Sequence, residues 1–207
     1  MEVKKINGNK VRATKTKNKI YQCADQLFKE YGFDNVSVDS IVEKAGISKG
    51  TFYVHFDSKD SLIVALITEY VSKLDLDYRA FLKSFPEDTS SSVVLFSLVE
   101  KIADFIGSSI GYIEMKNVYR IQIDRTVDTS MLLGANRDIY GTFQDLIDQG
   151  IRQGEFRSDF SAKTVAVHLV MAMRGLCYEW CIRYPDFNLK EQMMEHFTLL
   201  LSGLKKV

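Results

Sequence analysis

Apolar residues recur along this chain at the spacing of amphipathic helices, and no stretch alternates in the way that a half-buried strand would. The clearest repeat is Val38, Ile41, Val42 and Ala45, which fall on one face of a short helix. Longer repeats predict helices over about 14–31, 58–85, 93–106, 139–151, 161–183 and 188–204. The pattern therefore predicts an all-α protein, with one or two further short helices in 112–123.

The segment from Ser37 to Phe56 is predicted to form two short helices joined by a tight turn. Ser37 is expected to cap the first, because its hydroxyl can accept a hydrogen bond from an otherwise unpaired backbone N–H. Gly46 follows the last apolar position, where helices often end through a positive φ angle. Ser48 is expected to cap the second helix, in which Phe52 and Phe56 lie four residues apart and can pack inward.

This packing leaves Lys49, Thr51, Tyr53 and His55 on the outer face of the second helix. A helix-turn-helix has this organisation: the first helix supports the second, whose N-terminal residues enter the major groove of DNA. Gly50 lets the backbone approach a phosphate or a base closely. The same pattern also suits an ordinary helical hairpin inside an all-α protein, so the pattern alone leaves both interpretations open.

Charge is distributed unevenly along a chain whose formal net charge is zero. Residues 1–19 contain seven Lys or Arg residues and one Glu, a net charge of +6. Residues 1–13 are expected to form a flexible basic arm, with Thr14 and Thr16 as candidate caps of the first helix. A basic arm beside a helix-turn-helix is typical of phosphate contact. Without that neighbour, a charged terminus would indicate only a solubilising segment.

Two stretches link this pattern to a known family. Gly46-Ile-Ser-Lys-Gly-Thr-Phe-Tyr-Val-His-Phe56, followed by Ser58-Lys-Asp-Ser-Leu62, resembles the signature of the TetR family of transcriptional regulators. Upstream residues match at the family's spacing and extend the resemblance over roughly residues 14 to 66: Ala24, Leu27, Phe28, Gly32, Phe33, Ser37, Val38 and Ile41. The rest of the chain is similar to the family only in length and helical character.

The resemblance implies DNA contacts from matching positions. Lys49 is implied as the base reader, since a lysine can donate to guanine in the major groove. Ser37 and Lys59 are implied to contact backbone phosphates. The implied DNA-binding residues are Ser37, Ser48, Lys49, Gly50, Thr51, Tyr53, His55 and Lys59.

The resemblance also implies two domains: a three-helix helix-turn-helix DNA-binding domain over 14–60, and a helical ligand-binding and dimerisation domain over 61–207. A helix-turn-helix monomer reads few base pairs, so a homodimer on a palindromic operator of double-stranded DNA is expected. The helices near 162–183 and 189–204 are implied to pair across the two-fold axis. The implied function is a one-component regulator, most often a repressor, released by a small-molecule effector.

Aromatic and methionine residues in the second half suggest an effector cavity, because methionine adapts to irregular shapes and aromatic walls suit apolar ligands. Ordinary core packing is the better explanation for any one of these residues taken singly. Arg174 lies in an apolar helical segment, where a buried charge needs an acid, a ligand or a dimer partner. The candidate ligand-binding residues are Phe81, Phe105, Tyr119, Met171, Arg174 and Tyr178.

Other chemistry has little support in the sequence. Cys177 and Cys181 lie one helical turn apart with His168 over two turns away, which is too few ligands for a metal site and a poor fit to a disulfide. No nucleophile–base pair or phosphate loop is visible, so we expect no catalytic residues, metal or cofactor. The alternative function is a small-molecule-binding or enzymatic protein with a vestigial helix-turn-helix.

The chain also lacks the marks of export. Its N-terminus has no apolar segment typical of a signal peptide. No run approaches the roughly 18 apolar residues of a membrane span, and three cysteines form no disulfide framework. We therefore expect a cytoplasmic protein without membrane contact.

Overall fold

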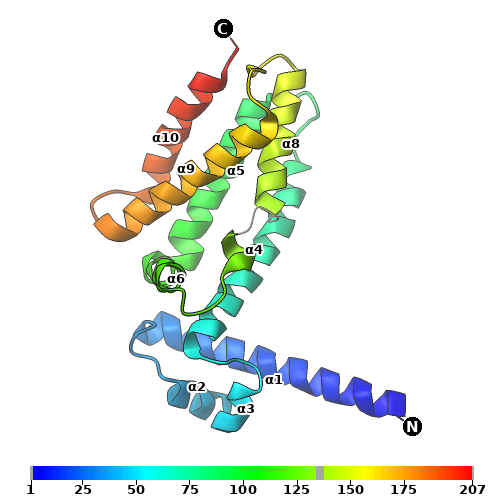
Figure 1. Ribbon diagram of the computed structural model, residues 1–207, viewed down its shortest axis with the longest axis vertical. Helices are drawn as coiled ribbons and strands as arrows, with labels where there is room; N and C mark the ends of the chain where they lie inside the picture. The colour runs from blue at the N-terminus through cyan, green and yellow to red at the C-terminus, as the bar shows by residue number, and fades with distance from the viewer. Residues whose placement is uncertain (1, 134–137, 207) are drawn as a thin grey trace.

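The computed structural model describes residues 2–133 and 138–206, and within these residues the chain forms helices and no strand (Figure 1). Met1, Val207 and 134–137, which fall in the predicted arm and second domain, lie outside the described part. The elements are α1 (Glu2–Tyr31), α2 (Val38–Ala45), α3 (Lys49–Tyr53), α4 (Lys59–Leu82), α5 (Ser91–Asp104), η1 (Phe105–Ile110), α6 (Tyr112–Asp124), α7 (Ser130–Leu133), α8 (Asp138–Arg152), α9 (Ala162–Arg183) and α10 (Leu189–Leu204). The predicted all-α fold with an N-terminal helix-turn-helix is confirmed.

Serine side chains set the starts of the helices around the turn. The backbone N–H of Ser40 donates to Ser37 Oγ, and that of Ser37 donates to Ser40 Oγ, both at 3.1 Å. Ser58 and Ser61 exchange the same two bonds at 3.0 Å where α4 begins. These reciprocal bonds satisfy N–H groups that a helix start leaves unpaired. Gly46 ends α2 with a φ of 59°, a left-handed conformation that favours glycine.

The first helix begins earlier than the sequence predicted. α1 starts at Glu2, so the expected helix start at Thr14 or Thr16, after a separate arm, is wrong. Thr16 Oγ1 instead donates to the carbonyl of Arg12, one turn back inside the helix, at 3.0 Å. Residues 2–13 contain no proline, and a single interior glycine costs a helix only about 1 kcal/mol relative to alanine.

Two clusters of buried side chains hold the fold together. The N-terminal cluster joins α1, α2, α3 and the start of α4, and it also includes Val118 and Ile121 of α6 and Leu132 of α7. The second cluster joins α5, α8, α9 and α10 around fully buried side chains such as Leu98 and Phe143. The helix-turn-helix domain therefore shares its core with α6, and α4 runs from one cluster toward the other (Figure 1).

The sequence predicted a helix ending near residue 106, but the chain continues there as η1, a π-helix that follows α5 directly. The helix ends only at Gly111, which has a φ of 85°. Glycine provides that angle without strain. π-helical turns are rare and occur frequently at functional sites.

By length and composition α9 is the one described helix that could cross a membrane, with a mean hydropathy of 1.3 over 18 residues. Of that stretch, 44% is buried within the protein, and α9 packs against α6, α8 and α10. This is the position of a core helix in a globular domain.

Candidate DNA-binding surface and effector cavity

One face of α3 is buried, and the opposite face carries exposed polar side chains. Phe52 is fully buried, and its ring centroid lies 5.7 Å from that of Phe56. Lys49 and Tyr53 are exposed, the tyrosine to 48%. The short helix is therefore anchored on its inner side and open on the side that carries Lys49 and Tyr53.

The Lys49 ammonium has a partner within the protein. It lies 2.8 Å from Asp39 Oδ1 on α2. The hydrogen bond and the negative charge of Asp39 raise the pKa of Lys49, so the lysine remains a cation at neutral pH. Both side chains are more than half exposed, so this ion pair lies on the surface where a DNA phosphate or base edge can compete for the ammonium.

The other residues implied around the turn occupy helix starts and open surface. Ser48 caps α3: its Oγ accepts from the N–H of Thr51 at 3.1 Å and lies 2.9 Å from Thr51 Oγ1. A side chain at Gly50 would meet nothing nearer than Ser48 Oγ at 3.8 Å, so the surface there is unobstructed. His55 is half-buried and its neighbour Val54 is 80% exposed.

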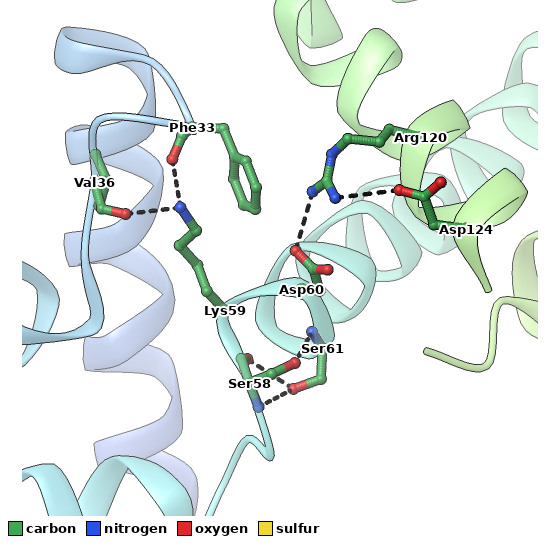
Figure 2. Close-up of polar contacts among 8 residues, drawn as sticks. All are labelled: Phe33, Val36, Ser58, Lys59, Asp60, Ser61, Arg120 and Asp124. Carbon is green, nitrogen blue, oxygen red and sulfur yellow. Dashed lines mark hydrogen bonds and ion pairs between the residues drawn. The ribbon is translucent and has the colours of Figure 1, made fainter. Parts of the chain in front are cut away.

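Lys59 differs from the rest of the implied set, because its ammonium is turned inward (Figure 2). Nζ donates to the carbonyls of Phe33 at 2.8 Å and Val36 at 2.9 Å, and it lies 4.1 Å from the Phe33 ring centroid. Burial lowers the pKa of Lys59. The structure thus gives Lys59 a role that the resemblance did not imply: it fastens the α1–α2 loop to the start of α4.

α1 adds positive charge next to the turn. Lys15, Lys17 and Lys19 are exposed. Lys17 Nζ lies 5.5 Å from the Tyr21 ring centroid and 5.8 Å from that of Phe56, at the end of the α3 segment. The Lys19 ammonium reaches the turn, 3.8 Å from where a Cβ on Gly46 would be. The cations on α1 therefore extend the surface that α3 begins.

A mostly apolar cavity of about 120 Å³ lies in the larger domain. The space lies where α4, α5, α6, α7, α8 and α9 meet around η1. The lining residues are Ile67, Val71, Tyr78, Ile102, Phe105, Ile106, Ile110, Met115, Val118, Tyr119, Gln122, Leu132, Ile139, Val170, Met173, Arg174 and Cys177.

Half of the candidate ligand-binding residues line this cavity: Phe105, Tyr119 and Arg174. The other three do not line it. Phe81 packs edge-on against Phe85 with ring centroids 5.1 Å apart, near the end of α4. Met171 lies on the outer face of α9 and is 59% exposed. Tyr178 is 40% exposed, and its ring packs edge-on against that of Tyr119 on α6, with centroids 5.4 Å apart.

The polar groups of the cavity are few. Tyr119 Oη donates to the backbone carbonyl of Arg174 at 2.9 Å, which ties α6 to α9. Burial raises the pKa of Tyr119 well above its usual value. Burial also raises the pKa of the Cys177 thiol to about 12, while the nearby positive charge of Arg174 lowers it by a smaller amount. Both groups are therefore neutral at physiological pH.

The outer faces of α9 and α10 carry large apolar side chains in solvent. Ile182 is 60% exposed and Leu199 70%, in addition to Met171. Between the two helices lies a groove of about 290 Å³, lined by Phe160, Thr164, Val165, His168, Leu169, Leu200 and Leu204. Contiguous apolar surface of this kind marks interaction sites.

Arg120 joins α6 to the start of α4 through a partly buried contact (Figure 2). Its guanidinium lies 3.1 Å from Asp60 at the start of α4 and 3.7 Å from Asp124 on its own helix. It also lies 5.6 Å from the Phe33 ring centroid. Arg120 Nε is buried and has no hydrogen-bond partner among the described residues.

The sequence of this chain is similar to those of known transcriptional regulators. Residues 20–66 match the model of bacterial regulatory proteins of the tetR family. The HTH-type transcriptional regulator YvdT of Bacillus subtilis (strain 168) is 48% identical over 197 residues, covering 90% of this chain and 93% of the relative. The HTH-type transcriptional repressor BepR of Brucella suis biovar 1 (strain 1330) is 26% identical, covering 89% of each chain.

A solved structure shares the fold over nearly the whole length. Thermus thermophilus FadR, a TetR family transcriptional repressor in complex with lauroyl-CoA, superposes with a TM-score of 0.71. The two chains are 20% identical, and the match covers 92% of this chain and 96% of FadR. The likeness therefore includes the C-terminal helices as well as the helix-turn-helix.

Proposed function

Because the chain belongs to the TetR family of bacterial regulatory proteins, we propose that it is a homodimeric one-component repressor that binds a palindromic DNA operator and leaves it when a small-molecule effector occupies the C-terminal cavity. Its relatives are transcriptional regulators rather than enzymes. The protein would act in the cytoplasm, where the DNA is accessible.

The observation that carries the proposal is the outer face of α3. Lys49 and Tyr53 are exposed on a helix whose Phe52 is fully buried, so the helix can enter a groove without losing its anchor. Ser37, Ser48, Gly50, Thr51 and His55 remain the proposed neighbours of the DNA at the turn. Lys59 contributes indirectly, by holding the loop that precedes α2.

Dimerisation has support in the exposed apolar faces of α9 and α10. Met171, Ile182 and Leu199 are each more than half exposed, although large apolar side chains usually lie inside. Pairing these faces across a two-fold axis would cover them and would set two α3 helices at a fixed separation. Two such helices are needed to read an inverted repeat.

Release by an effector requires a link between cavity and DNA. A ligand can weaken DNA binding only if it binds the released conformation more tightly than the DNA-bound one. α6 supports such a link, because Tyr119 lines the cavity and the next residue, Arg120, contacts Asp60 at the start of α4. A small movement of α6 would therefore reach the helix that follows α3.

The test is selection of DNA from a random duplex library. The wild-type protein should recover an inverted repeat, and a Lys49→Ala, Tyr53→Ala double variant should lose it. Lys83→Ala, exposed at the far end of α4, is the matched control and should recover the same repeat. Salt-sensitive binding without a consensus sequence would indicate that the protein contacts only DNA phosphates. No recovery by a folded dimer would overturn the proposal.

The dimer is tested separately by light scattering. Wild type should have the mass of a dimer, and Leu199→Glu should shift it toward a monomer by placing a charge in the paired face. Lys163→Glu, at an exposed polar position on α9, is the control for added negative charge and should stay dimeric. A monomeric wild type at working concentrations would contradict this part of the proposal.

A further inference from the structure

We infer that the cavity takes an amphipathic monoanion, a small carboxylate with an apolar body, whose carboxylate is bound by Arg174. The inference rests on the proposed function only in taking this cavity as the effector site. It depends on the charge balance of the lining, on the free donors of Arg174 and Gln122, and on the size of the space.

The charge balance of the lining favours an anion. Among the lining residues that the structure describes, Arg174 is the one that is charged, and no Asp or Glu accompanies it there. Most of the remaining wall is aliphatic, aromatic or methionine. A cation in such surroundings is unfavourable unless it is paired. A cationic ligand would add a second uncompensated positive charge, whereas an anionic ligand would neutralise the first.

The donors for that anion are available. Within the part of the chain that the structure describes, neither the Arg174 guanidinium nor the Gln122 side-chain amide has a hydrogen-bond or ion-pair partner. The backbone carbonyl of Arg174 is occupied by Tyr119 Oη, which fixes α9 against α6 at this point. A guanidinium presents paired N–H groups that match the two oxygens of a carboxylate.

The electrostatics of the neighbouring groups agree with this assignment. Burial raises the pKa of Cys177 and of Tyr119, and the Arg174 charge acts in the opposite direction on both. The guanidinium therefore lies close enough to these two lining side chains to influence them. Since both stay neutral at physiological pH, neither supplies the missing negative charge.

The size of the space limits the apolar body. A dry cavity of about 150 Å³ lined by similar side chains holds benzene, so a cavity of 120 Å³ suits roughly six carbon atoms. Met115 and Met173 give the wall some adaptability, because methionine side chains rearrange easily. A six-carbon chain ending in a carboxylate is therefore the matched probe.

The experiment compares three probes of nearly equal shape: hexanoate, hexanamide and hexylamine. Their binding to the full-length protein without DNA is measured by calorimetry, and the site is located by NMR of ¹³C-labelled methionine methyl groups. Hexanoate should bind about tenfold or more tightly than hexanamide, the difference expected for hydrogen bonds to a charged group. Resonances of Met115 and Met173 should shift, and that of Met171, on the outer face, should not.

Variants at Arg174 separate charge from shape. Arg174→Gln should bring the affinities for hexanoate and hexanamide within about threefold of each other, and Arg174→Lys should keep the preference for hexanoate because the charge remains. Arg183→Gln, exposed near the end of the same helix and paired with Asp186, is the matched control and should behave as wild type. Circular dichroism confirms that each variant is folded.

Several results would overturn the inference: equal or tighter binding of hexanamide or hexylamine, a preference for hexanoate that survives Arg174→Gln, shifts confined to Met171, or no binding of any probe at about 10 mM, beyond the weak end of specific affinities. DNA selection is independent of this outcome. A protein that selects hexanoate through Arg174 but recovers no operator keeps the ligand class and loses the proposed regulation.

Discussion

The Arg120 guanidinium lies 3.1 Å from the Asp60 carboxylate, and this pair connects α6 of the effector domain to the first turn of α4 (Figure 2). Both ends of the pair have further roles. Arg120 also faces Phe33, and Asp60 sits where a negative charge favours the helix dipole. The pair therefore fixes how α6 meets the DNA-binding domain at one defined point.

The two substitutions that break this pair should lower the free energy of unfolding by different amounts. Asp60→Asn removes both the pairing and the favourable dipole contact. Arg120→Met keeps an apolar stem on Phe33 and removes a buried nitrogen that has no partner among the described residues. We expect Asp60→Asn to be the more destabilising, with a coupling energy of up to about 1 kcal/mol in the double-mutant cycle.

Urea unfolding of the wild type, the two single variants and the double variant measures this coupling. Arg79→Met with Asp138→Asn provides a control cycle on an ion pair that joins α4 to α8, remote from the helix-turn-helix. Loss of the Arg120–Asp60 pair, but not of the control pair, should also change operator affinity. Additive effects of Arg120→Met and Asp60→Asn would show that the contact carries no energy.

On the proposed function, Lys49 exchanges Asp39 for DNA, so Asp39 is expected to weaken operator binding. Asp39→Asn removes the competing carboxylate and its repulsion of phosphate, and we expect roughly two- to fivefold tighter binding at low salt, the scale of an exposed ion pair. The gain should shrink as salt rises, because exposed charges are screened. Fluorescence anisotropy with the selected operator measures both effects.

The control for that prediction is Asp186→Asn, which also breaks an exposed ion pair but at the far end of α9. It should leave operator affinity unchanged. Weaker operator binding by Asp39→Asn would mean that Asp39 positions Lys49 for DNA instead of competing for it.

The sequence predicted the helices best where local chemistry decides the structure. The serine caps at Ser37 and Ser48 and the left-handed Gly46 depend on residues a few positions apart, and all were correctly placed. Lys59 shows the limit of such reasoning. Its acceptors, the carbonyls of Phe33 and Val36, are 26 and 23 residues away, so only the folded chain reveals that the ammonium is turned inward.

The cavity was harder to predict because α9 is apolar on nearly every side. Periodicity identifies a helix of this kind but does not say which face is inside. Met171 proved to be on the outer face, while Met173 and Cys177 line the cavity. The missed α4 residues Ile67 and Val71 carried only a weak signal, since apolar residues four apart on a helix suit plain core packing equally well.

Gly150 and Gly141, both in α8, should respond in opposite ways to alanine. A Cβ at Gly150 would collide with the ring of Phe156, which is buried. Overpacking typically costs about 1–3 kcal/mol, more than the gain of up to about 1 kcal/mol in helix propensity. We therefore expect Gly150→Ala to lower the free energy of unfolding by about 1–2 kcal/mol.

Gly141 provides the matched control, since a Cβ there meets nothing within 4 Å. Gly141→Ala should stabilise the protein by up to about 1 kcal/mol, because alanine favours the helix. Thermal unfolding of both variants at equal protein concentration measures the difference. A stabilising Gly150→Ala would mean that Phe156 can leave its place over α8.

The three cysteines should react at widely different rates. Burial raises the pKa of Cys177 to about 12 and that of Cys181 to about 11, whereas Cys23 is only half-buried. Since the thiolate is the reactive form, its fraction at pH 8 is roughly 10⁻⁴ for Cys177, and burial slows access further. Iodoacetamide should therefore label Cys23 first and Cys177 last, as read by peptide mass spectrometry.

Raising the pH toward 10 increases the thiolate fraction, so labelling of Cys177 should accelerate about tenfold per pH unit while the fold persists. In urea the three sites should label at similar rates, which controls for reagent preference. Labelling of Cys177 as fast as Cys23 in the folded protein would contradict the placement of Cys177 in the cavity wall.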